Sequence, residues 1–68
     1  MTNTAKLRDK IAEVGITITA LARQCGVSRE TMHSKIEGSS EFKAPEIHAI
    51  TQALRLTREE RDAIFFDV

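Results

Sequence analysis

The stretch LARQCGVSRETMHSKI, residues 21–36, decides the fold of this 68-residue chain. Within it, Ala22 is a small residue of the kind that lets two helices approach closely. Four positions later, Gly26 permits a tight turn between them. Met32 and Ile36 lie one helical turn apart, so both are expected to face inward from the helix after the turn. Two short helices that cross at a steep angle require these features, and we therefore predict a helix-turn-helix.

Capping residues and glycines give the boundaries of the helices around this stretch. The β-branched residues 16–19 would also suit a strand, but the ALARQ run that follows is strongly helical and no partner strand is apparent. We therefore expect the helix-turn-helix motif to cover about residues 17–37. We predict one helix from Thr4 to Val14 that ends at Gly15, a second that is capped by Thr17 and broken by Gly26, and a third that is capped by Ser28, runs to about Glu37 and ends at Gly38.

Two more helix starts follow in the second half of the chain. Pro45 suits the first turn of a fourth helix, where its missing N–H costs nothing. Thr57 and Glu60 form the capping box of a fifth. Five short helices without a convincing strand predict a compact all-α fold, and we expect a single domain over residues 1–68. Leu7, Ile11 and Val14 form one apolar stripe on the first helix, and Ile47, Ile50 and Leu54 mark the buried face of the fourth.

The charge is unevenly distributed along the chain. The formal net charge is zero, which on its own argues against a strongly basic nucleic-acid binder. Residues 1–35 nevertheless carry six bases and three acids, whereas residues 36–68 carry four bases and seven acids. The first half can therefore present a positive face although the whole chain is neutral.

Composition excludes several classes of site. The single cysteine, Cys25, cannot form an internal disulfide, which favours a cytoplasmic setting. No Cys/His cluster has metal-ligand spacing, and His33 and His48 lie on different predicted helices without an accompanying nucleophile or phosphate-binding loop. No apolar run approaches the roughly 20 residues of a membrane helix, and the first residues lack the apolar region of a signal peptide. We predict no metal, no cofactor, no membrane segment and no enzymatic activity.

Two segments carry a resemblance to a known family. SRETMHSKIEG (residues 28–38) resembles the recognition-helix segment of the Cro/repressor family of phage and bacterial helix-turn-helix regulators. PEIHAITQALRLTREE (residues 45–60) resembles the fourth helix and the start of the fifth in that family, and the likeness extends over residues 5–66. The resemblance implies a five-helix, lambda-repressor-like domain that binds double-stranded operator DNA with its third helix, residues 28–37, in the major groove.

The resemblance also implies which side chains touch DNA. Arg29 can offer a bidentate fork to guanine, and Glu30 can accept a hydrogen bond from cytosine, although both would also suit an ordinary solvated first turn. Residues that flank the recognition helix are expected to bind phosphates. The predicted base contacts are Ser28, Arg29, Glu30, His33 and Ser34, and the predicted phosphate contacts are Thr17, Thr19, Arg23, Lys35, Ser39, Ser40 and Lys43.

Three positions depart from the family pattern. Ile18 stands where many members have a glutamine that binds phosphate. That contact is therefore either missing or replaced by one from Thr17 or Thr19. Cys25 replaces a larger aliphatic residue, and we interpret it as a small buried hydrophobe rather than a redox sensor. The inward residue near the end of the recognition helix is Ile36, not the preceding Lys35.

The adjacent aromatic residues Phe65 and Phe66 cannot both point into one small core, because neighbours on a helix lie about 100° apart. One ring should be partly exposed, either at a dimer interface or over the edge of the core.

The function implied is that of a Cro-like or CI-like transcriptional regulator. The length favours a stand-alone protein, although a domain cut from a longer repressor would look nearly the same. The alternative is an anti-repressor or modulator that binds a partner regulator protein instead of DNA.

Overall fold

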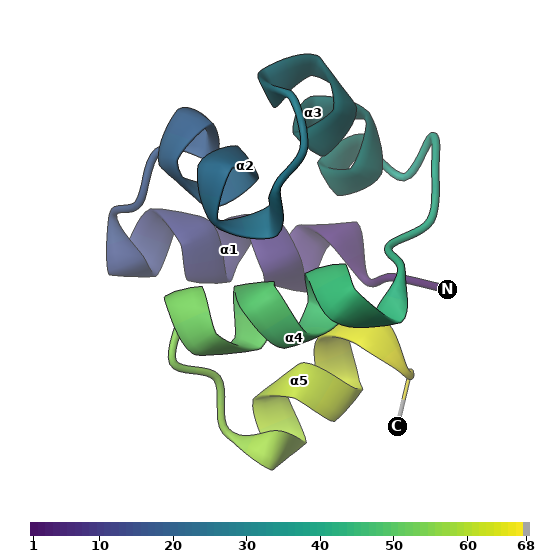
Figure 1. Ribbon diagram of the computed structural model, residues 1–68. Coiled ribbons are helices and arrows are strands. Elements are labelled where there is room, and N and C mark those ends of the chain that lie inside the picture. Colours follow the sequence, from purple (N-terminus) through teal and green to yellow (C-terminus); the bar gives the residue numbers. More distant parts are fainter. Residues whose placement is uncertain (68) are drawn as a thin grey trace.

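The computed structural model describes residues 1–67 and contains five α-helices and no strand in that part of the chain (Figure 1). This confirms the predicted all-α, five-helix fold. The bounds predicted for the first three helices and the predicted starts of the fourth and fifth lie within about a residue of those in the structure. The helices are α1 (Thr4–Val14), α2 (Ile18–Cys25), α3 (Arg29–Glu37), α4 (Ala44–Ala53) and α5 (Arg58–Phe65).

Side-chain caps start the helices where the sequence places them. The Thr17 hydroxyl accepts a hydrogen bond from the Ala20 N–H at 3.1 Å. At the start of α5 the predicted capping box is present: the Thr57 hydroxyl accepts from the Glu60 N–H at 3.1 Å, and the Glu60 carboxylate accepts from the Thr57 N–H at 2.8 Å. These bonds satisfy N–H groups that have no partner inside their own helix.

The turn between α2 and α3 depends on Gly26. Its backbone is left-handed, with φ at +71°, a conformation that residues with a side chain rarely adopt. Here the Val27 N–H donates to the Ala22 carbonyl at 3.1 Å, and the Gly26 N–H donates to the Arg23 carbonyl at 3.2 Å. The chain therefore reverses within three residues while the last carbonyls of α2 stay bonded.

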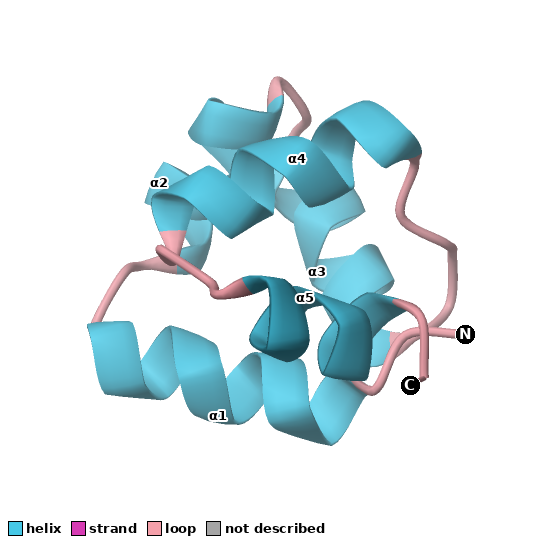
Figure 2. Ribbon diagram, turned by 90° about the horizontal axis from the view of Figure 1, so that it is seen from below, coloured by secondary structure: helices cyan, strands magenta, loops and turns pink. Residues whose placement is uncertain are grey.

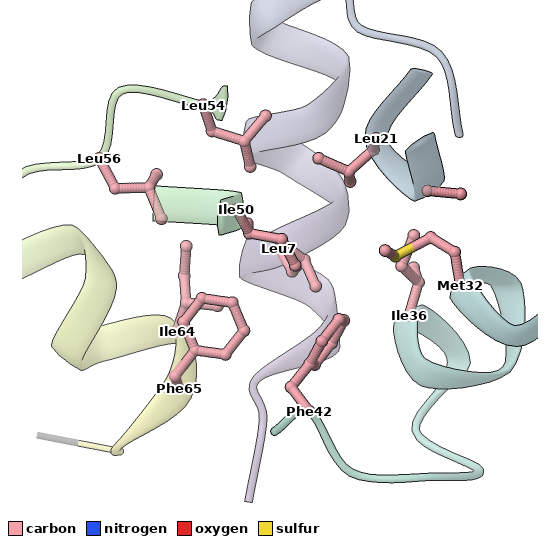
Figure 3. Packing of buried hydrophobic residues seen from close by; sticks show 11 residues of the cluster. Leu7, Leu21, Met32, Ile36, Phe42, Ile50, Leu54, Leu56, Ile64 and Phe65 are labelled. Carbon is pink, nitrogen blue, oxygen red and sulfur yellow. The ribbon is translucent and has the colours of Figure 1, made fainter. Parts of the chain in front are cut away.

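The core lies where all five helices meet, and Leu7 of α1 is at its centre (Figure 3). Leu7, Leu21 and Met32 are fully buried. The apolar stripe predicted on α1 is only partly buried: Ile11 packs against the core, whereas Val14 is 44% exposed. Val14 is the last residue of α1.

The first residues of the chain lie close to the end of α5, as both ribbon views show (Figures 1 and 2). The Asn3 N–H donates to the Ile64 carbonyl of α5 at 2.6 Å. The α3 helix lies at the opposite end of the molecule from α5 in Figure 1, and in Figure 2, which is seen from below, α5 lies in front of α3. None of the helices described in residues 1–67 is both long enough and apolar enough to cross a membrane.

Candidate nucleic-acid interface

The α2 and α3 helices pack against each other through one face of α3 and leave the opposite face in solvent. Met32 and Ile36 point into the core, with 0% and 3% of their surface exposed. Ala22 of α2, 3% exposed, is the small residue predicted at this helix crossing. Because the inward face is occupied by these apolar side chains, the polar residues of α3 other than Lys35 are left outward or half-buried.

The predicted base contacts lie on this outward face. Ser28, Arg29, Glu30 and His33 are exposed, and Ser34 is half-buried. Arg29 and Glu30 occupy the first turn of α3, the part of a recognition helix that reaches furthest into a groove. Their side chains make no hydrogen bond or ion pair with another described residue, so both are free to meet a ligand.

Two of these side chains already have partners within the protein. The Ser28 hydroxyl accepts from the Thr31 N–H at 3.1 Å and donates to the Thr31 hydroxyl at 2.9 Å. The His33 Nε2 atom lies 3.4 Å from Glu37 Oε2, one turn further along α3. Thr31, which is exposed, was not predicted as part of this surface. Its position three residues after the cap Ser28 would have identified it as a partner of the cap.

The predicted phosphate contacts flank α3 on two sides. The start of α2 and the loop of residues 38–43 lie on either side of α3 in both ribbon views (Figures 1 and 2). All but one of the seven residues are exposed: Thr17, Thr19 and Arg23 on the α2 side, and Ser39, Ser40 and Lys43 on the loop side.

Lys35 is the exception, and the structure argues against its predicted phosphate role. It is 6% exposed, and its Nζ atom lies 3.1 Å from Oε1 of Glu46, on α4. The same ammonium donates to the Glu41 carbonyl at 2.8 Å. A cation with these internal partners is not available to DNA, so Lys35 is not retained in the contact surface.

Sequence reasoning missed Glu46, the partner of Lys35. Glu46 is 8% exposed, and its carboxylate also accepts from the Lys43 backbone N–H at 2.8 Å. Burial alone raises the pKa of the Glu46 carboxyl, but the hydrogen bonds from Lys43 and Lys35 and their positive charges outweigh it, and the pKa is lowered overall. The position of Glu46 in the first turn of α4, next to Pro45, is the signal that would have suggested a capping role.

The two family departures on α2 both face the protein. Ile18 packs against the core, so it offers no polar group for a phosphate contact. Cys25 is half-buried, and its thiol lies 3.9 Å from the Glu46 carbonyl oxygen. Burial and the neighbouring Glu46 charge raise the pKa of this thiol. Both features fit a small packed side chain better than a reactive thiolate.

The aromatic pair at the end of α5 divides as expected, with one ring buried and one exposed. Phe65 is 5% exposed and belongs to the core, so its predicted place in a dimer interface is corrected (Figure 3). Phe66 is 52% exposed, and its ring centroid lies 5.8 Å from the Arg61 guanidinium carbon. It borders an open hollow between α4 and α5 that is also lined by Ala44, Ile47, His48, Thr51 and Arg61.

Within residues 1–67, no group of three or more His, Cys, Asp or Glu side chains is arranged to hold a metal ion. A family model described as a helix-turn-helix domain, of the Cro-like type, matches residues 5–64. The chain matches no curated protein. It also matches no solved structure.

Proposed function

This chain belongs to the helix-turn-helix domain family, and from that premise we propose that it is a Cro-like transcriptional regulator that binds operator DNA by sequence. The third helix, α3, lies in the major groove with its first turn toward the base edges. Binding at an operator blocks or redirects transcription by occupying the site. The observation that carries the proposal is the exposed outward face of α3, whose opposite face is held in the core by Met32 and Ile36.

Arg29 is the principal base-reading residue in this proposal. Its guanidinium can donate two hydrogen bonds to O6 and N7 of one guanine. Glu30 accepts from cytosine N4, and Ser34 and His33 make contacts that depend on the bases opposite them. Ser28 keeps its hydroxyl on Thr31 and orients the first turn of the helix.

The phosphate contacts come from both flanks of α3. Thr17 and Thr19 approach the backbone from the start of α2, and Ser39 and Ser40 approach it from the loop. Arg23 and Lys43 supply the positive charge. Only these two basic side chains are proposed to contact phosphates in each protomer. A plot of log affinity against log salt concentration should therefore have a slope of about −2 per protomer.

Two copies of the chain are proposed to bind one operator. A single module with so few contacts binds weakly, whereas a dimer engages two half-sites about one helical turn apart. Phe66 is the exposed aromatic side chain available for a contact between copies, and Ile47 lies beside it in the same hollow. Sedimentation equilibrium of wild type and Phe66→Ser tests this step, with self-association expected to weaken in the variant.

A second candidate function uses the same Phe66 surface differently. An anti-repressor or modulator would bind a partner regulator protein there and would not need DNA. The zero net charge and the exposed Phe66 favour this reading. A titration with random and selected duplexes separates the two functions: a regulator binds DNA with a salt-dependent affinity, whereas a modulator binds neither duplex and loses its partner in Phe66→Ser.

A further inference from the structure

We propose that Lys35 and Glu46 are positioning residues for DNA binding, which together hold the loop of residues 38–43 in a fixed place against α3. The inference rests on the proposed function, because the loop carries three of the proposed phosphate contacts. Neither residue touches DNA in this account. Each acts through the backbone of the loop.

Lys35 joins three parts of the molecule at one point. From α3, its Nζ atom reaches Glu46 Oε1 on α4 at 3.1 Å and the Glu41 carbonyl in the loop at 2.8 Å. The same atom lies 5.9 Å from the centroid of the Phe42 ring. The aromatic face attracts the ammonium, and the ring is itself buried in the core. The middle of the loop is thereby bonded directly to the recognition helix.

Glu46 holds the far end of the same loop. Its Oε1 atom accepts from the Lys43 backbone N–H at 2.8 Å and also contacts the Lys35 ammonium. Lys43 is the last residue before α4, so its side chain leaves the backbone from a point that Glu46 fixes. Together the two side chains connect α3, the loop and α4 through one buried ion pair.

Stability alone does not account for this arrangement. The Lys35 and Glu46 side chains are 7% and 11% exposed, so both charges have lost most of their water, and a pair of packed apolar residues is often at least as stabilising. Apolar side chains would fill the space but would not bond the Glu41 carbonyl or the Lys43 N–H. The ion pair instead fixes where the backbone of residues 41–43 lies relative to α3.

The pair would fix the position of the proposed phosphate contacts relative to the proposed base contacts. Base contacts come from α3, and the phosphate contacts of Ser39, Ser40 and Lys43 come from the loop. The two sets can meet one stretch of DNA together only if the distance between helix and loop is constant. The Lys35–Glu46 pair provides this constraint before DNA is bound, so less ordering is needed on binding.

The experiment combines a measurement on the free protein with one on the DNA complex. Lys35→Met removes the ammonium but keeps a long apolar side chain, and Glu46→Gln removes the charge but keeps an acceptor for the Lys43 N–H. In the free protein, exchange of the Lys43 amide, which donates to Glu46, should accelerate about tenfold in Lys35→Met and less in Glu46→Gln, while the amides of α1 keep their protection. Affinity for a selected duplex should fall about tenfold in Lys35→Met.

A double-mutant cycle with Lys43→Ala separates positioning from direct contact. If Lys35 acts through the loop, Lys43→Ala costs several-fold in affinity in wild type and much less in the Lys35→Met background. Full additivity, or loop exchange equal to that of wild type, overturns the proposal. If Lys35→Met does not fold, the same exchange and cycle measurements on Glu46→Gln decide. If wild type does not bind DNA, the proposed function is refuted, and the positioning role fails with it. The exchange result still tests whether the Lys35–Glu46 pair holds the loop in place.

Discussion

The Phe42 ring lies against the Phe65 ring in an edge-to-face contact, with the ring centroids 5.4 Å apart and the ring planes at 81°. Phe42 belongs to the loop that follows α3, and Phe65 is the last residue of α5. The contact therefore connects the proposed DNA-binding end of the chain with its C-terminal helix. It is one of the contacts that bury Phe65, whereas the neighbouring Phe66 is half-exposed.

Replacement of the two neighbouring phenylalanines should have very different effects on stability. Phe65→Ala removes a buried ring and its contact with Phe42, and the free energy of unfolding should fall by about 3–5 kcal/mol. Phe66→Ala removes a half-exposed ring and should cost less than about 1 kcal/mol. Urea denaturation at a concentration where the protein is monomeric measures both values, and equal losses would contradict the assignment of Phe65 to the core.

Gly26→Val should destabilise the domain by about 1–3 kcal/mol. A Cβ atom added at Gly26 would meet nothing within 4 Å, so the cost comes from the left-handed backbone and not from a clash. A β-branched residue is especially poorly suited to that conformation. Thermal melting followed by circular dichroism gives the change, and an unaltered melting temperature would reject this explanation of the turn.

Arg55 offers the opposite test. It follows α4 with φ at +54°, a left-handed conformation that is unfavourable for arginine and better tolerated by asparagine. Arg55→Asn should therefore raise the free energy of unfolding by about 0.5 kcal/mol. The same melting experiment detects this rise, and a loss of stability would indicate that the arginine side chain makes a compensating contact.

Stability should decrease in acid because two carboxylates are held in their ionised forms. The hydrogen bond from Lys10 lowers the pKa of Glu60, and the net effect of the contacts around Glu46 lowers the pKa of that carboxyl despite its burial. A carboxyl whose pKa is lower in the folded state stabilises the fold above its unfolded pKa, and this stabilisation disappears as the pH falls.

The melting temperature should thus decline below about pH 5. The decline should be shallower in Glu46→Gln and in Glu60→Gln than in wild type, because each variant lacks one of the groups that must be protonated. Melting curves recorded from pH 7 to pH 2 give this comparison. Curves that run parallel for all three proteins would show that neither carboxylate is linked to folding.

Sequence reasoning predicted the features that depend on near neighbours along the chain. The caps Thr17 and Ser28, the box of Thr57 and Glu60, and the left-handed Gly26 each involve residues within about four positions of one another, so their spacing is readable directly. Together with Gly15 after α1 and Pro45 in the first turn of α4, these local signals place at least one end of each of the five helices.

What sequence reasoning did not predict depends on contacts between distant segments. Lys35 looks like a solvated lysine on a helix until α4 brings Glu46 beside it, and eleven positions separate the two residues in the sequence. Phe65 and Phe66 are the same residue type, but Phe65 packs against Phe42 in the core whereas Phe66 is 52% exposed. Neither outcome has a local signal, since each is set by how the helices pack.

The most direct test of whether the outward face of α3 reads DNA is the affinity of the chain for selected duplexes. Fluorescence anisotropy over a series of salt concentrations measures it. Selection from a random duplex library supplies the preferred sequence. We expect log affinity to fall linearly with log salt, and Arg29→Ala to relax the preference at one base pair at a cost of about 1–3 kcal/mol. Salt-independent or absent binding, or a base preference that Arg29→Ala leaves intact, would contradict the account.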